Sequence, residues 1–156
     1  DPKFAGPAAL AKAWRFTEDP RDEATSERLA TLNDASGAMW DCTRCMKCVD
    51  VCPKEVAPMD RIMEMREAAI KAGHTNTPGY RHTESMYNSV KKNGRLDETR
   101  LAIDSAGWTN IPRLLDLAPI GIAAMRKGKL PPILPHKSED HKKVKELFES
   151  VEGDSE

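Results

Sequence analysis

The chain has 156 residues, about the length of one domain, and its formal net charge at pH 7 is −1. With 39% hydrophobic and 31% charged residues it has the balance of a soluble globular protein and lacks the basic surplus of a nucleic-acid-binding domain. No apolar run approaches the roughly 20 residues that a membrane-spanning helix needs. No signal peptide is recognisable, and the first residue is Asp1, so we expect a processed, excised or renumbered chain.

Apolar residues recur at helical spacing throughout, and little of the sequence alternates with a period of two, which predicts an all-α fold. The first predicted helix spans about residues 7–18 and ends before Asp19-Pro20. Its buried side is expected to hold Leu10, Ala13, Trp14 and Phe16. A second helix, about 25–32, has Thr25 or Ser26 as its expected cap.

Four cysteines, the only ones in the chain, follow within eleven residues: Cys42, Cys45, Cys48 and Cys52. Thiols at every third residue can surround one small iron–sulfur body while the amide N–H groups of the loop point at its sulfurs. After Cys48 the step lengthens to one helical turn, which predicts that Cys48 and Cys52 share a side of a short helix. Pro53 is expected to end that helix at Cys52.

The proline also indicates a second cluster, because in two-cluster ferredoxins the cysteine before it ligates the other cluster. Zinc is a weaker interpretation, since its ligands usually come as two pairs a dozen or more residues apart. Disulfides would need an oxidising compartment and usually a small, loop-rich domain. The spacing therefore favours iron–sulfur ligation over both alternatives.

Three more helices are predicted after the cysteines, at about 58–73, 80–92 and 97–106. The first should present one side made of Met59, Ile62, Met63, Arg66 and Ile70. The second should bury Met86, Tyr87 and Val90.

The last part of the chain begins with an unusually apolar segment, 111–125, which Pro119 is expected to divide into two short helices. This segment is either ordinary core or a patch that docks on a membrane-anchoring subunit. A proline-rich stretch, 129–135, should be extended. Ser138 is expected to cap a final helix whose apolar side holds Val144, Leu147, Phe148 and Val151.

Five short segments in the first part of the chain form a characteristic series: Phe4-Ala-Gly-Pro-Ala-Ala-Leu, Ala13-Trp-Arg-Phe, Asp19-Pro-Arg-Asp, Arg28-Leu and Cys48-Val-Asp-Val-Cys-Pro-Lys. In order and spacing they resemble the C-terminal ferredoxin-like domain of the iron–sulfur subunit of succinate dehydrogenase and fumarate reductase. The resemblance implies a helical ferredoxin fold, with the second half of a two-cluster domain at 1–110 and a C-terminal helical docking extension at 111–156. The first cysteine motif of such a domain would lie outside this chain.

The resemblance also implies which cluster each cysteine serves. Cys42 and Cys48 would hold the last cluster, and Cys52 would give the fourth ligand to a middle [4Fe–4S] cluster completed by residues absent from this chain. The position of Cys45 is usually not cysteine in this family, where the last cluster is [3Fe–4S]. Cys45 therefore implies a [4Fe–4S] cluster at that site.

As a member of such a complex the chain would relay electrons and have no catalytic residues of its own. Its implied partners are a flavoprotein subunit that handles succinate or fumarate, the missing N-terminal half of the iron–sulfur subunit, and a membrane-anchor or cysteine-rich subunit that handles quinone or thiols. The implied location is peripheral, on the cytoplasmic side of the membrane, or the matrix side in a mitochondrion. Thr43 stands where ubiquinone-reducing members commonly have histidine, which argues against ubiquinone reduction at this subunit.

The segment Gly128-Lys-Leu-Pro-Pro-Ile-Leu-Pro-His136 is similar to the tails of heterodisulfide-reductase-type iron–sulfur subunits and of succinate dehydrogenases with a cysteine-rich membrane partner. A heterodisulfide-reductase-like subunit is therefore one alternative function. A zinc-stabilised interaction module is an alternative of a different class.

The remaining candidate residues have ordinary explanations. His74, His82, His136 and His141 lack a second ligand at metal spacing and are expected on the surface or at helix caps. Met59, Met63 and Met65 are expected to pack beside the cysteines. Arg44, Lys47 and Lys54 are either solvated or placed to favour the reduced, more negative cluster.

Overall fold

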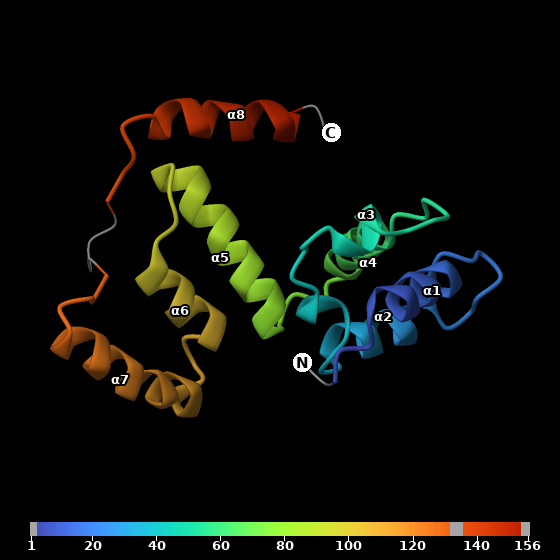
Figure 1. Cartoon of the computed structure of the whole chain (residues 1–156), viewed down its shortest axis with the longest axis horizontal. Helices are drawn as coiled ribbons and strands as arrows, with labels where there is room; N and C mark the ends of the chain where they lie inside the picture. Colours follow the sequence, from blue (N-terminus) through green and yellow to red (C-terminus); the bar gives the residue numbers. More distant parts are fainter. Residues whose placement is uncertain (1–2, 132–135, 154–156) are drawn as a thin grey trace. The chain divides into compact units, whose positions relative to one another are not determined.

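The structure is a computed structural model that describes residues 3–131 and 136–153 (Figure 1). These residues form helices α1 to α8 and one 3₁₀ helix, and none of them is in a β-strand, so the all-α prediction is confirmed. The chain divides into two compact units, Asp1–Thr77 and Pro78–Glu156. The functional division expected at residue 110 stays a prediction.

The first unit carries the cysteines, and its elements follow the predicted order. They are α1 (Pro7–Thr17), α2 (Thr25–Asp34), the 3₁₀ helix η1 (Met39–Asp41), α3 (Lys47–Asp50) and α4 (Pro58–Lys71). Prolines start α1 and α4. Proline is tolerated there because the first N–H of a helix has no acceptor within the helix, so its absence removes no hydrogen bond. The expected Thr25 cap is wrong, because α2 has Ala24 at its N-cap and the Thr25 hydroxyl donates to the carbonyl oxygens of Thr17 and Asp22.

The core of this unit lies where α1 and α2 pack on α4. Its buried members are Leu10, Trp14, Leu29, Met39, Ile62, Met65 and Ala69. The buried side of α4 is thus centred on Ile62, Met65 and Ala69, whereas Ile70, expected on that side, is 38% exposed. The sulfur-bearing Cys42 packs against this core, so the start of the cysteine loop is attached to the rigid part of the unit.

Phe16 is the exception on α1, because its ring is 45% exposed instead of buried. The guanidinium carbons of Arg15 and Arg28 lie 5.8 and 6.0 Å from the ring centroid. Such cation–π contacts can cover part of an aromatic ring that is not buried in the core.

A close crossing holds the N-terminal segment beside the turn that precedes η1. The amide of Ala5 donates to the carbonyl oxygen of Gly37 over 2.8 Å, and the Gly37 amide donates to the Asp41 carboxylate. Gly37 has φ +82°, and a Cβ at this position would collide with the backbone of Lys3. Only glycine fits here without moving the segment that leads into the cysteines.

The second unit consists of α5 (Pro78–Asn93), α6 (Glu98–Ala106), α7 (Ile111–Arg126) and α8 (His141–Gly153). Helix α5 packs on α6 and on α8, and α7 packs on α6 (Figure 1). Ala106 is the only buried apolar residue among the described residues of this unit.

The prediction for the buried side of α5 is wrong for Met86 and Tyr87, whereas Val90 is half-buried. Met86 and Tyr87 are 42% and 41% exposed, whereas Ser85, Ser89 and Asn93 are buried. These short side chains recur at every fourth residue, on one side of the helix. The Ser85 hydroxyl donates to Asp104 of α6 over 2.7 Å. Close helix approach, and not apolar content, therefore decides which side of α5 is covered.

Helix α8 is tied to α5 through partly exposed contacts. The Tyr87 and Phe148 rings meet edge to face at 5.1 Å, and Lys91 Nζ lies 2.6 Å from a carboxylate oxygen of Glu152. Val144 and Phe148 are half-buried, but Leu147 and Val151, expected beside them, are 65% and 69% exposed. The cap expected at Ser138 is displaced, because α8 begins at His141.

The expected break at Pro119 is also wrong, because α7 is one helix from Ile111 to Arg126 with Pro119 inside it. A proline removes a single N–H donor and disturbs one preceding turn, and an exposed helix can leave that carbonyl to water. Lys129 to Pro131 lack regular structure, as expected. The rest of the proline-rich stretch, 132–135, lies outside the described residues.

Replacing Asp22 by Asn should reduce stability in a pH-dependent way. Arg28 donates to both carboxylate oxygens of Asp22 over 3.0 to 3.2 Å, and this lowers the pKa of Asp22 below its ordinary value of 3.8. A lowered folded-state pKa contributes stability above that ordinary value and loses it as the pH falls below it.

We therefore expect the difference in unfolding free energy between the parent chain and Asp22→Asn to be present at pH 6 and to shrink progressively as the pH falls below 3.8. Urea denaturation followed by circular dichroism at a series of pH values measures it. Glu23→Gln, at an exposed neighbouring position, is the matched control. A difference that stays constant across the series would contradict the role of the pair.

Candidate functional site

The four cysteines lie along one surface segment between η1 and α4. Cys42 follows η1 and is half-buried, Cys45 is exposed in the loop, and Cys48 lies half-buried in α3. Cys52 follows α3 and is also half-buried. All four thiols are free.

Helix α3 is shorter than predicted. It ends at Asp50, and Cys52 lies in the following turn, where its amide donates to the Val49 carbonyl oxygen over 3.2 Å. Cys48 and Cys52 therefore do not share a side of a continuous helix. The residue before a proline is pushed out of the helical region, and here the effect reaches one residue further back, to Val51.

The backbone around the cysteines is unusual, because every non-glycine residue with positive φ among those described lies there. These residues are Arg44, Met46, Glu55 and Ala57, with φ between 44° and 63°. A left-handed residue costs roughly 1–2 kcal/mol, so four in one segment need a reason. Alternation of left- and right-handed residues turns successive N–H groups to one side and forms the anion-binding concavities found at phosphate and iron–sulfur sites.

Cys52 shows this arrangement most directly. The backbone N–H groups of Val56 and Lys54, with a smaller contribution from Glu55, hydrogen-bond to its sulfur and lower the pKa of the thiol below its ordinary value. The thiolate is the form that binds metals. The turn after α3 is therefore built to hold a sulfur anion.

Arg66 of α4 fixes the other end of the cysteine segment. Its Nη2 donates to the carbonyl oxygens of Met39 and Cys42 over 2.5 and 2.8 Å, and its Nε donates to Met39 over 3.0 Å. Its guanidinium carbon also lies 5.0 Å from the ring centroid of Trp40. One side chain of α4 thus joins the start of η1 to Cys42.

The charge of Arg66 is buried, since the residue is only 4% exposed. Burial, followed by repulsion from Arg44, lowers the pKa of Arg66 to about 10. This value is still far above neutral pH, so the guanidinium remains charged. The helical period predicted that Arg66 lies on the packed side of α4 but not that it binds the cysteine segment, although a charged residue among apolar neighbours was the available signal.

The four thiols of the segment are donors of the kind that suits a soft metal. No three His, Cys, Asp or Glu side chains among the residues described are placed to hold one metal ion. Residues 43–47 are exposed throughout, so no buried side chain opposes adjustment of this loop.

The other candidate residues behave as ordinary side chains. His82 Nδ1 lies 3.0 Å from the Ser105 hydroxyl, and His141 Nδ1 lies 2.9 Å from the Ser138 carbonyl oxygen. Met65 is fully buried, while Met59 and Met63 are half-buried on the same helix. The basic side chains beside the cysteines, at Arg44, Lys47 and Lys54, are exposed.

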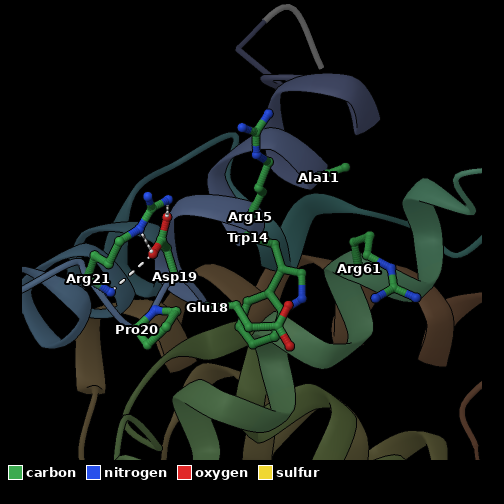
Figure 2. A pocket seen from close by; sticks show the side chains of 8 residues that line it. All are labelled: Ala11, Trp14, Arg15, Glu18, Asp19, Pro20, Arg21 and Arg61. Carbon is green, nitrogen blue, oxygen red and sulfur yellow. Dashed lines mark hydrogen bonds and ion pairs between the residues drawn. The ribbon is translucent and has the colours of Figure 1, made fainter.

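A cavity of about 600 Å³ lies along α1 on the same unit (Figure 2). Its lining residues are Ala11, Trp14, Arg15, Glu18, Asp19, Pro20, Arg21 and Arg61. Arg21 pairs with Asp19 over 2.6 Å, and Arg61 pairs with Glu64 over 2.8 Å. The remaining charged side chains of the lining, Arg15 and Glu18, have opposite signs, so the cavity has little excess charge with which to select an ion.

Comparison with known families places the cysteines inside a recognised domain. Residues 7–56 match the family described as "4Fe-4S dicluster domain". The match includes all four cysteines and ends just before α4.

Curated relatives extend the similarity. The chain is 28% identical over 131 residues to the 8-methylmenaquinol:fumarate reductase iron-sulfur subunit of Wolinella succinogenes. The aligned region covers 83% of this chain and 39% of the relative. It is 45% identical over 64 residues to the fumarate reductase iron-sulfur subunit of Escherichia coli O6:H1, covering 41% of this chain and 26% of the relative. A mitochondrial succinate dehydrogenase iron-sulfur subunit of Arabidopsis thaliana is 36% identical over 64 residues, covering 41% of this chain and 21% of that relative.

The chain thus spans at most 39% of the length of these relatives. No solved structure matches it. The comparisons confirm the family resemblance and iron–sulfur clusters as the cofactor class. They give no support to a heterodisulfide-reductase-like subunit or a zinc module. The assignment of the individual cysteines as ligands stays a prediction.

Replacing Arg66 by Met should destabilise the first unit by roughly 2–4 kcal/mol, because the buried carbonyl oxygens of Met39 and Cys42 lose their donors. Urea denaturation measures the total, and hydrogen exchange of the amides at 39–42 should locate the loss. Arg61→Met, on the same helix in a partly exposed ion pair, is the control and should cost no more than about 1 kcal/mol. Equal effects of the two changes would contradict the bridging role of Arg66.

Proposed function

We propose that this chain, which is related to the iron–sulfur subunits of fumarate reductase and succinate dehydrogenase, is an electron-transfer part of an oxidoreductase complex of that type. The observation that carries the proposal is the four-cysteine segment inside the matched domain, with a backbone whose N–H groups turn toward a sulfur. When bound, iron–sulfur clusters supply one-electron transfer. The residues of this chain would bind the clusters, orient them and set their surroundings.

Cys42, Cys45 and Cys48 would hold the cluster that the sequence resemblance makes the last one of the subunit, called the first cluster from here on. Cys52 would serve the middle cluster, called the second. Cys42 is fixed by the core and by Arg66, so it would give the first cluster a rigid attachment. Cys45 lies in the exposed loop and would close onto the cluster from outside. Cys52 has its own set of backbone donors, separate from the Arg44 to Met46 turn, which supports its assignment to a different cluster.

Cys45 decides the type of the first cluster. Three thiolates from this chain and one from outside it would complete a [4Fe–4S] ligand set, whereas loss of the Cys45 ligand would favour [3Fe–4S]. Hydrogen bonds to sulfur and solvent exposure also set the reduction potential. The exposed position of Cys45 is therefore a place at which water can reach the cluster and shift that potential.

The partners follow from the relatives and are proposals for this chain. A flavoprotein would exchange electrons with succinate or fumarate on one side, and a membrane-anchor or cysteine-rich subunit would handle a quinone or thiols on the other. The Wolinella succinogenes relative is named for 8-methylmenaquinol, a quinol, which makes a quinol the leading candidate. Residues from the preceding part of an iron–sulfur subunit would complete both ligand sets.

The proposed location is the membrane surface on the cytoplasmic side. Across the residues with an assigned structure, no helix has both the length and the apolar content to cross a bilayer. Electrons would pass between this chain and the quinol or quinone through a neighbouring subunit.

The complex purified without oxygen should contain iron and acid-labile sulfide in equal amounts with no stoichiometric zinc. Chemical analysis of iron, sulfide and zinc checks this. Removal of the clusters with a chelator and an oxidant should abolish electron transfer between the flavoprotein and the quinol site, and anaerobic reconstitution should restore it. Stoichiometric zinc without sulfide would overturn the proposal.

Changing Cys45 to Ser should convert the first cluster from a four-iron to a three-iron form, with loss of about one iron per complex and the appearance of a three-iron electron paramagnetic resonance signal. Thr43→Ser, at an equally exposed loop position, should leave iron content and spectrum unchanged. A three-iron signal in the unaltered, anaerobically prepared complex would contradict the role given to Cys45.

A further inference from the structure

Helix α7 carries an apolar side that no other helix of its unit covers. Its substantial contacts are with α6, beside which it runs in Figure 1. The residues that are half-buried against that neighbour recur at steps of three and four: Leu114, Leu117, Gly121 and Ala124. The packed side of α7 is therefore accounted for, and it is a different side from the one discussed next.

The exposed apolar side follows the same helical period. Its members, spaced by four, three, four and three residues, are Ile111, Leu115, Ala118, Ile122 and Met125. Residues at this spacing form one continuous stripe along a helix. Ile111 and Leu115 are each 65% exposed, and Met125 is 64% exposed. Large apolar stripes of this kind mark a surface that meets another molecule or a membrane.

The charged residues of the segment that contains the stripe are mostly positive. From residue 108 to residue 130 the chain has four basic residues, Arg113, Arg126, Lys127 and Lys129, and one acidic residue, Asp116. All five are exposed. The whole chain has a net charge of −1, so this local surplus is not a general property of the protein. An anionic surface is the complement of this segment.

An exposed tryptophan stands directly before the helix. The Trp108 side chain is 69% exposed, while its indole N–H donates to Asp104 over 2.8 Å. The polar edge of the ring is thus satisfied inside the protein, and its apolar face is presented outward. Tryptophan in this position is typical of segments that lie at the boundary between lipid and water.

We propose that α7, with Trp108 before it and the basic residues around it, is an interfacial helix that lies on an anionic lipid surface. Its stripe would enter the boundary between headgroups and acyl chains, and Arg126, Lys127 and Lys129, at the C-terminal end of the helix, would meet the phosphate groups. Arg113 and Asp116 lie on the other side of the helix, where their charges offset each other. Pro119, inside the helix, lies beside the stripe and not in it. The proposal goes beyond cluster binding and does not depend on the cysteines.

Sedimentation of the full chain with lipid vesicles tests the proposal. Vesicles with one third phosphatidylglycerol in phosphatidylcholine should bind on the order of 100-fold more tightly than pure phosphatidylcholine, because three net positive charges approach the surface. Binding should weaken as salt is raised. Trp108 fluorescence should shift to the blue on binding, and Trp108→Phe should remove most of that shift.

Two substitutions in α7 distinguish binding through the stripe from nonspecific hydrophobic binding by the rest of the helix. Leu115 and Ile120 are both 65% exposed, but Ile120 lies on the opposite side of α7 from the stripe. Leu115→Glu and Ile120→Glu add the same charge, so their electrostatic cost should be similar. We expect Leu115→Glu to bind at least 10-fold more weakly than Ile120→Glu, because only the former places a carboxylate in the apolar boundary.

Three outcomes would overturn the proposal: equal effects of the two variants, equal binding to neutral and anionic vesicles, or no vesicle binding. Concentration-dependent self-association that Leu115→Glu abolishes, without vesicle binding, would assign the stripe to a second copy of the chain. Circular dichroism confirms that each variant is folded. Iron and sulfide content should be unchanged in Leu115→Glu, so loss of lipid binding and failure of the cluster assignment are distinguishable.

Discussion

The geometry of the cysteine segment depends on a buried guanidinium. Arg66 stands on the packed side of α4 and donates to the carbonyl oxygens of Met39 and Cys42, which links the longest helix of the first unit to the point where the cysteine loop begins. Burying an unpaired charge is costly, and here carbonyl oxygens and the Trp40 ring offset that cost. The arrangement fixes one end of the loop and leaves the part that carries Cys45 exposed and adjustable.

The two units are stabilised in different ways. The first has a continuous apolar core in which α1, α2 and α4 meet, and it holds the cysteines at the edge of that core. Of the described residues of the second unit, only Ala106 is a buried apolar one, and the unit relies on short polar residues between α5 and α6, together with partly exposed contacts to α8. A first unit with a continuous core suits the positioning of redox centres, whereas a thinly packed second unit with exposed apolar residues suits docking.

The backbone around the cysteines adopts an unfavourable conformation at several residues. Four left-handed non-glycine residues lie among and just after the cysteines, and beside two of them, Glu55 and Ala57, backbone N–H groups hydrogen-bond to the Cys52 sulfur. The lowered pKa of Cys52 shows one result of this arrangement. Strain, donor direction and thiol chemistry thus point to the same kind of ligand, and the comparisons with iron–sulfur subunits agree with them.

The sequence by itself determined the helical class, most helix positions and the cysteine motif, because helical period, prolines and cysteine spacing are local properties. It could not determine which side of each helix is covered, since that depends on the neighbour. Small residues at Ser85 and Ser89 displaced Met86 and Tyr87 from the interior, and Pro119 did not divide α7 because the helix is exposed there.

Only the tertiary structure joined Arg66 to Cys42, two residues 24 positions apart in the sequence. It also placed left-handed residues around the cysteines and left the α7 stripe uncovered. The physical reason is the same in each case: a side chain's role depends on which groups from distant segments are near enough to bond with it or to exclude water from it.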